Sequence, residues 1–206
     1  MAAALLLWGA ALGAWNGQSK PVVIDGKADA LPERIETLIL RYTNVERQKA
    51  GLVPLKPDAI LTQSARGHSS EMAKLNYFGH RSPNAQNREL EQRLRKVGAT
   101  LEGTRFGENI GVDFVLAISD VPYIKRRVKG RTRYYTGDGF KEIQPQSDDQ
   151  FARSMVAQWM ASPGHRANIL NPGFTHIGIG VARGRWQELD AFYVTQNFQG
   201  ALATDP

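Results

Sequence analysis

The side chains best suited to chemistry in this sequence are its four histidines, because the chain has no cysteine. A disulfide framework, a thiolate metal site and a cysteine nucleophile are therefore excluded. His165 has the most defined setting, in the run Ser162-Pro163-Gly164-His165. Ser162 suits an N-cap and Pro163 the first helical position, so His165 falls in the first turn of a short helix. The partial positive charge there favours a neutral imidazole, with a lone pair free for a metal or a proton.

The elements on either side of this histidine can be predicted from the pattern of apolar residues. An amphipathic helix ends near Ala161, and its apolar face carries Met155, Val156 and Trp159. Asn171-Pro172-Gly173 stops the short helix. A half-buried strand follows, because the apolar residues alternate with small ones at Ile177, Ile179 and Val181.

Several motifs resemble the bacterial branch of the CAP superfamily, whose domain is also called the SCP domain. That superfamily groups cysteine-rich secretory, antigen-five and plant pathogenesis-related proteins. The matching runs are WMASPGHRANIL at 159–170, Phe174-Thr175, Gly178-Ile179-Gly180, ARGHSSEMAKLNYFGH at 65–80, Gly107-Glu108-Asn109-Ile110 and YVTQNF at 193–198. The resemblance covers residues 34–198. It implies an α+β fold, a CAP-type α-β-α sandwich with a small antiparallel sheet flanked by helices.

The resemblance also implies a central cavity lined by two histidines and two acidic residues. His80 and His165 match the histidines and Glu108 the first acid, whereas the second acid falls on Ser162. Two histidines and one glutamate are a recognised ligand set for zinc, with a position left open for water. Alternatively, the same three residues hydrogen-bond around a buried polar centre without a metal. Asp148 or Asp149 could replace the missing acid only if the start of their helix lies over the cavity.

The two other histidines are predicted to lie outside this set. His68 belongs to the apolar stripe of a helix that begins near Asp58, together with Leu61, Ala65, Met72 and Leu75. We therefore interpret it as a buried histidine hydrogen-bonded to the backbone or a neighbouring side chain. His176 begins a strand and is interpreted as a surface residue.

Local signals predict the remaining elements. The first helix runs from Pro32 to a stop at Gly51, and a third short helix spans Asn87 to Val97, with Leu90 and Leu94 on its apolar side. Ser147 and Gln150 form a capping box for the helix that ends near Ala161. A turn is expected around Gly184, before the closing strand.

A basic insertion at about 112–145 is predicted to form a projecting hairpin, with strands at 121–128 and 131–135 joined around Lys129-Gly130. Its cations are Lys125, Arg126, Arg127, Lys129, Arg131 and Arg133. They account for the whole formal net charge of +6, so the rest of the chain sums to zero. The patch is either a solvated face or a docking surface for anionic lipid, cell-wall polyanions or a protein. Nucleic acid is not expected as its partner.

The N-terminal residues 1–14 are predicted to be a signal peptide, because the apolar run is too short to span a membrane but suits a signal sequence. No lysine or arginine precedes the run. Residues 15–31 are interpreted as a linker or arm, 32–200 as the CAP/SCP domain and 201–206 as a tail. The chain is therefore expected to be secreted, periplasmic or in the cell envelope, with no transmembrane anchor after processing.

Three functional hypotheses follow. The first is a secreted bacterial binding protein whose His80, Glu108 and His165 cavity holds a divalent metal, and whose ligand is an extracellular lipid, peptide or cell-envelope component. The second is a metal-dependent hydrolase that acts on peptide or ester bonds at the same residues. The third is an interaction module that docks anionic partners through the basic hairpin. The sequence favours binding over catalysis, because the second carboxylate is missing.

Overall fold

The computed structural model describes residues 32–118 and 122–202. The predicted signal peptide and the segment 15–31 lie outside the described residues, as does most of the predicted tail. In the described part of the chain, no helix is long and apolar enough to span a membrane.

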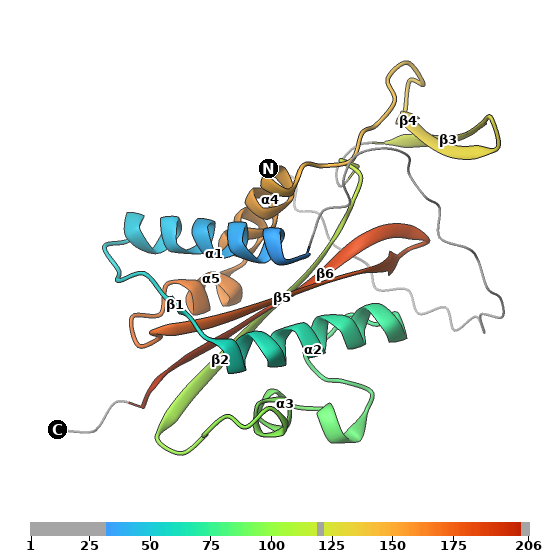
Figure 1. Ribbon diagram of the computed structural model, residues 1–206. Coiled ribbons are helices and arrows are strands. Elements are labelled where there is room, and N and C mark those ends of the chain that lie inside the picture. The colour runs from blue at the N-terminus through green and yellow to red at the C-terminus, as the bar shows by residue number, and fades with distance from the viewer. Residues whose placement is uncertain (1–31, 119–121, 203–206) are drawn as a thin grey trace.

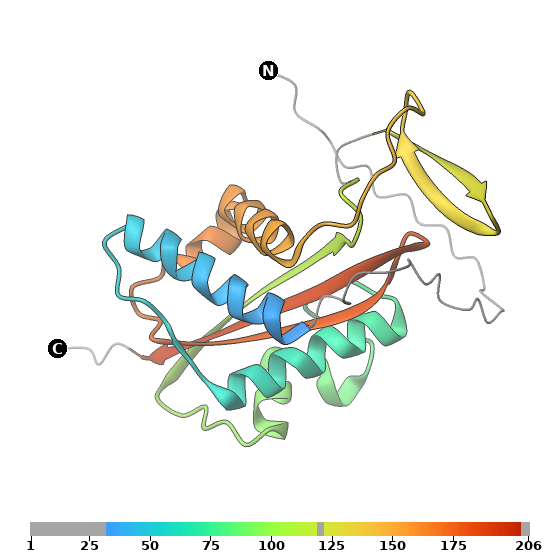
Figure 2. The ribbon, with the colours of Figure 1, turned by 45° about the horizontal axis from the view of Figure 1, so that its top comes forward.

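Three layers build the domain, with a four-stranded sheet in the order β1-β5-β6-β2 as the middle layer. Helices α1, α4 and α5 cover one face of this sheet and α2 and α3 the other (Figures 1 and 2). The long strands pair antiparallel, whereas the two-residue β1 runs parallel to β5. The predicted α-β-α sandwich is thus confirmed. The elements are α1 (Pro32–Lys49), β1 (Lys56–Pro57), α2 (Ala59–Leu75), a 3-10 turn (Ala85–Asn87), α3 (Leu90–Lys96), β2 (Thr104–Phe114), β3 (Tyr123–Val128), β4 (Arg131–Thr136), α4 (Asp148–Ala161), α5 (Pro163–Ile169), β5 (His176–Trp186) and β6 (Leu189–Ala201).

The predicted caps set the helix ends. The Asp58 side chain accepts a hydrogen bond from the Leu61 amide at 2.8 Å and starts α2. Ser147 and Gln150 form the predicted capping box of α4. Gly51 has a φ of 73°, the left-handed conformation that ends α1.

The main core lies between the sheet and the helices α1 and α4. Apolar residues of both helices pack there on the bulky residues of β5 and β6, and the buried set includes Ile35, Ile39, Phe151, Met155, Trp159, Ile177, Ile179, Val181, Val194 and Phe198. Because β-strand side chains alternate, these residues of β5 all point to the same face of the sheet.

The opposite face of β5 is lined by glycine, which lets the backbone of α2 lie directly on the strand. A Cβ atom added at Gly178 would come within 2.1 Å of the Leu61 carbonyl carbon, and one at Gly180 within 2.1 Å of the Arg66 amide nitrogen. Residues 177–181 are therefore buried on both faces. The prediction of a half-buried strand was wrong, because the small residues face a helix and not solvent.

Three boundaries also differ from the prediction. Gly184 lies inside β5, where it packs against Ala73, and the turn to β6 is made by Gln187 and Glu188 at positive φ. Leu75 is 51% exposed, because α2 ends there. α3 begins at Leu90, after the separate 3-10 turn, and not at Asn87.

Candidate functional site

The candidate site lies along the outer edge of β2, the last strand in the sheet order. Glu108 points from β2 toward α2 and α3, and the next residue, Asn109, points to the opposite face. There the Asn109 amide donates to the backbone carbonyl of His165 on α5 at 3.2 Å. Both helical layers therefore meet around this edge, one through Glu108 and the other through His165.

Side chains of α4 and α5 also bind the outward-facing carbonyls of β2. Asn168 donates to the carbonyl of Glu108 at 3.1 Å, and the Trp159 indole donates to that of Ile110 at 2.9 Å. These bonds satisfy an edge that would otherwise be open for pairing with another strand. They also fix the position of α5, and with it His165, relative to Glu108.

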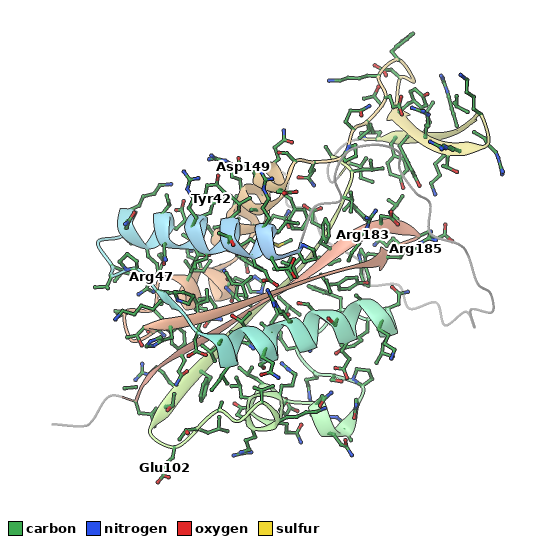
Figure 3. All side chains as sticks on the ribbon, in the orientation of Figure 1. Tyr42, Arg47, Glu102, Asp149, Arg183 and Arg185 are labelled. Atoms are coloured by element: carbon green, nitrogen blue, oxygen red, sulfur yellow. The ribbon has the colours of Figure 1, made fainter. Side chains whose placement is uncertain are left out.

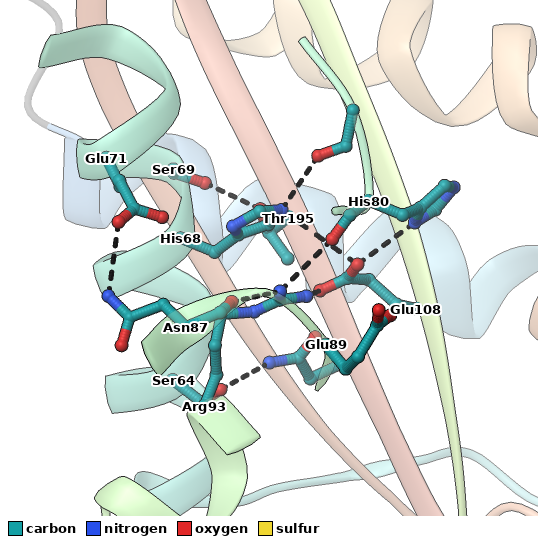
Figure 4. Close-up of polar contacts among 12 residues, drawn as sticks. Ser64, His68, Ser69, Glu71, His80, Asn87, Glu89, Arg93, Glu108 and Thr195 are labelled. Carbon is teal, nitrogen blue, oxygen red and sulfur yellow. Dashed lines mark hydrogen bonds and ion pairs between the residues drawn. The ribbon is translucent and has the colours of Figure 1, made fainter. Parts of the chain in front are cut away.

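The Glu108 carboxylate is buried and surrounded by donors (Figure 4). One oxygen accepts from Nδ1 of His80 at 2.9 Å, and the other accepts from Nη2 of Arg93 at 2.7 Å. In the amide orientation that satisfies its neighbours, Asn197 adds a donor at 3.1 Å. Burial alone would raise the pKa of Glu108, but the His80 hydrogen bond and the Arg93 charge together lower it below its usual value. Glu108 is therefore ionised, and each of its carboxylate oxygens accepts a hydrogen bond.

Arg93 is the site residue that the sequence analysis missed. Its buried guanidinium binds Glu108 and also donates to the carbonyls of His80, Asn87 and Arg88 at 3.0 to 3.2 Å. The same group thus fixes both the carboxylate and the loop that carries His80. A signal was present in the sequence: Arg93 stands three residues after Leu90, on the apolar side of the predicted third helix.

His80 presents one ring nitrogen outward. Because the ionised Glu108 can only accept, Nδ1 of His80 must carry the proton in this hydrogen bond. In the neutral ring, Nε2 then holds the free lone pair. The side chain is 53% exposed, so this nitrogen is accessible from outside.

The neutral form of His165 is favoured, as predicted, but burial and a neighbouring charge are the causes and not the helix N-terminus. Burial lowers the pKa of His165, and the nearby His80 charge lowers it further. Pro163 occupies the first helical position as expected. Ser162 occupies the predicted N-cap position, and its backbone carbonyl accepts from the Arg166 amide at 2.9 Å, but its hydroxyl makes no capping hydrogen bond.

His68 lies behind Glu108, and its side chain is fully buried. Its Nε2 is 3.2 Å from the carbonyl of Gly79 and 4.0 Å from the Glu108 carboxylate. This confirms the interpretation of a buried, hydrogen-bonded histidine. Burial lowers the pKa of His68 to about 4, so its ring is neutral at physiological pH.

Acid should therefore destabilise the protein through His68. The unfolded chain protonates this histidine below about pH 6.5, whereas the folded protein resists until about pH 4. The free energy of unfolding that neutral His68 contributes is therefore fully present well above pH 6.5. It falls as the pH decreases, and the loss reaches about 2 kcal/mol at pH 5. Urea unfolding at pH 7.5 and 5.0 should show this loss in the wild type and a smaller one in His68→Gln. Equal losses in both proteins would contradict the assignment.

No acidic residue replaces the missing second carboxylate in the part of the chain that the structure describes. Asp149 accepts hydrogen bonds from Tyr42 and Arg153, and Tyr42 and Asp149 lie together between α1 and α4 (Figure 3). Asp148 forms an ion pair with Arg34 at 3.1 Å. Both acids are thus engaged on the α1 side of the sheet. His176 lies at the start of β5, two strands away from Glu108, beside Thr175.

A three-residue metal centre does not fit this arrangement. Within residues 32–118 and 122–202, no group of three or more histidine, aspartate or glutamate side chains is placed to hold an ion. Both oxygens of Glu108 already accept from His80 and Arg93. These bonds leave Nε2 of His80 without a partner on Glu108, and the charge of His80 is close enough to act on the ring of His165.

Comparison with known proteins identifies the family. The model of the cysteine-rich secretory protein family, CAP, matches residues 40–198. The chain belongs to the CAP family. This CAP domain is 32% identical over 145 residues to the uncharacterized protein YkwD of Bacillus subtilis, covering 70% of the chain and 41% of YkwD. It is 31% identical over 176 residues to the uncharacterized membrane protein YlbC of the same organism, covering 85% of the chain and 37% of YlbC. The chain thus spans about two fifths of these relatives.

Solved structures show the same fold. An extracellular protein containing an SCP domain from Bacillus anthracis aligns with a TM-score of 0.53 at 26% identity, covering 81% of this chain and 40% of that protein. An outer surface protein from Borrelia burgdorferi aligns with a TM-score of 0.51 at 16% identity, covering 86% of this chain and 98% of that protein. The second likeness concerns the fold alone.

Proposed function

We propose that this CAP domain works outside the cytoplasm as a binding protein, and that His80 and His165 take a divalent metal such as zinc, with Glu108 behind them. The extracellular setting is supported by the description of the Bacillus anthracis relative. The ligand would be an extracellular lipid, peptide or cell-envelope component. A bound metal would supply a Lewis-acidic contact to an anionic or carbonyl group of that ligand.

The observation that carries the proposal is the 2.9 Å hydrogen bond from Nδ1 of His80 to Glu108. Histidines that bind metals commonly donate their other ring nitrogen to a carboxylate, which fixes the ring and raises its basicity. Arg93 holds Glu108 in this supporting role. Two imidazoles supply only part of a coordination sphere, so the remaining positions are open to water or to the ligand.

Zinc titration by isothermal calorimetry tests this site. We expect His80→Ala and His165→Ala each to weaken zinc binding at least about tenfold, because each removes one of the two imidazole donors. Glu108→Gln should weaken it by about 10- to 100-fold, because the ring loses its orienting carboxylate. Each variant is first compared with the wild type by circular dichroism.

His176→Ala is the matched control, since it removes a histidine that lies two strands from the site. Its zinc affinity should equal that of the wild type. The proposal fails if the wild type binds no more zinc than His80→Ala, or if His176→Ala weakens binding as much as the site variants do.

A hydrolase is the second candidate, and the same hydrogen bond favours it. A histidine oriented by a carboxylate, with its other nitrogen exposed, is arranged as a general base. The missing second acid counts against this function. Hydrolysis of peptide or ester substrates that is lost in His80→Ala and kept in His176→Ala would favour the enzyme over the binding protein.

A further inference from the structure

The basic hairpin forms an appendage separate from the sandwich. β3 and β4 make a two-stranded sheet of their own, joined by Lys129 and Gly130 at positive φ (Figures 1 and 2). The strands lie where the sequence predicted them. β2 continues to Phe114, so this segment leaves the main sheet only after that residue. We use "hairpin segment" for residues 122–145.

Within the described residues, the base of the hairpin segment packs on the domain. Tyr134 and Ile143 pack on a small cluster of Leu116, Ile118 and Leu189 at the end of the main sheet. A two-stranded hairpin alone is marginally stable in water. This cluster therefore supports the base of the hairpin segment.

Charge in the hairpin segment is strongly unbalanced, with seven cations and two acids. Glu142 pairs with Arg133 at 2.7 Å, and the guanidinium of Arg126 lies over the ring of Tyr135. Lys125, Arg127 and Lys129 are exposed and form no ion pair with any residue that the structure describes. We call these three residues the unpaired cations.

The strand register adds to the repulsion. Arg126 stands directly opposite Arg133 in the β3–β4 pair. Like charges at such positions destabilise a hairpin, but Glu142 offsets Arg133 and the Tyr135 ring faces Arg126. The unpaired cations have no such partner among the described residues.

The geometry points to a linear polyanion as the partner, and we propose that the hairpin segment binds one through the unpaired cations. Alternation along β3 places Lys125 and Arg127 on one face of the hairpin and Arg126 on the other, with Lys129 at the turn. A flat membrane could contact only one of these faces, whereas a flexible chain can follow the cations around the turn. Lys125 and Arg127 are separated by about 6.8 Å along the strand, a spacing that suits successive charged groups of a polymer.

Binding of long-chain inorganic polyphosphate tests the proposal. We expect the wild type to bind it, and the triple variant Lys125→Gln, Arg127→Gln, Lys129→Gln to bind at least about tenfold more weakly at low salt. The slope of log Kd against log salt should decrease by up to roughly three, one for each cation removed. All three side chains are exposed, so the fold should be retained, as circular dichroism would verify.

The matched control removes three exposed lysines of the sandwich: Lys49→Gln, Lys56→Gln and Lys74→Gln. It lowers the net charge equally and should bind within about twofold of the wild type. Equal weakening in both triple variants would overturn the proposal, because net charge alone would then explain binding. Tighter binding to phosphatidylglycerol vesicles than to polyphosphate, or no polyphosphate binding, would also overturn it. Zinc binding at His80 provides a separate readout, so failure here leaves the metal site untouched.

Discussion

Replacing Arg93 with methionine should lower the free energy of unfolding by about 3 to 5 kcal/mol. Methionine keeps most of the buried volume but removes every donor that Arg93 supplies. Glu108 would remain buried without its cationic partner, and three backbone carbonyls would lose their hydrogen bonds. Urea unfolding at pH 7.5 measures the loss. Zinc binding should also weaken, because the His80 loop and the Glu108 carboxylate are no longer fixed to one another.

Two further variants separate this cause from a general packing defect. Arg81→Met removes a surface ion pair with Glu89, close to the same loop, and should change stability only slightly. In the double variant Arg93→Met, Glu108→Gln, the stranded charge is gone, so the loss should be smaller than for Arg93→Met alone. If the double variant is less stable than Arg93→Met, the buried charge is not the cause.

The pH dependence provides an independent check of the same interaction. Burial raises the pKa of Glu108, and the His80 hydrogen bond and Arg93 lower it, so removing Arg93 should raise that pKa above its wild-type value. The protonated carboxyl group is tolerated in a buried position, and the deficit of Arg93→Met relative to the wild type should therefore shrink between pH 7.5 and pH 5. A constant deficit across this range would contradict the assignment.

Local chemistry explains which parts of the fold could be predicted from the sequence. Asp58, the Ser147 and Gln150 pair and Lys129-Gly130 act on amides within a few residues of themselves, so their types and spacing were sufficient to place helix starts and a turn. Ser162 was also placed correctly at a helix start, but its hydroxyl does not make the capping hydrogen bond that its type suggested. A serine at the N-cap can therefore start a helix without its hydroxyl accepting a hydrogen bond from a backbone amide.

The candidate site was predictable only in part. Family resemblance identified His80, Glu108 and His165, and the structure brings Glu108 against His80. The role of Glu108 depends on Arg93, which lies 15 residues away in sequence and approaches it only in the folded protein. Residue types could not reveal that both carboxylate oxygens are already occupied. They could suggest only that an arginine on an apolar helix face needs a buried partner.

The pattern of β5 shows a second limit. Alternating apolar and small residues are typical of a strand with one face in solvent, and glycine at 178 and 180 fits that pattern. The same glycines also permit a helix backbone to pack directly on the strand. A strand with its glycines in solvent and a strand with its glycines under a helix have the same sequence pattern, because the apolar residues face the main core in both.

That packing makes Gly180→Ala one of the most damaging small substitutions available. The added Cβ would lie 2.1 Å from the Arg66 amide nitrogen and 2.2 Å from the Ala65 carbonyl carbon. Both are backbone atoms of α2, so the helix itself must move. Such a shift would also disturb the 2.9 Å hydrogen bond from Ser69 to the Gly180 carbonyl. We expect a loss of at least about 3 kcal/mol, at the upper end for overpacking, measured by urea unfolding.

Gly67→Ala is the matched control, because it adds the same methyl group to the other side of α2. Gly67 is exposed, and a Cβ atom there would meet no atom within 4 Å. In a helix interior this change should raise stability by about 0.5 to 1 kcal/mol. The two variants therefore differ in sign although the chemical change is identical. If Gly180→Ala is as stable as the wild type, α2 does not lie directly on β5, and the position of His68 behind Glu108 would have to be revised as well.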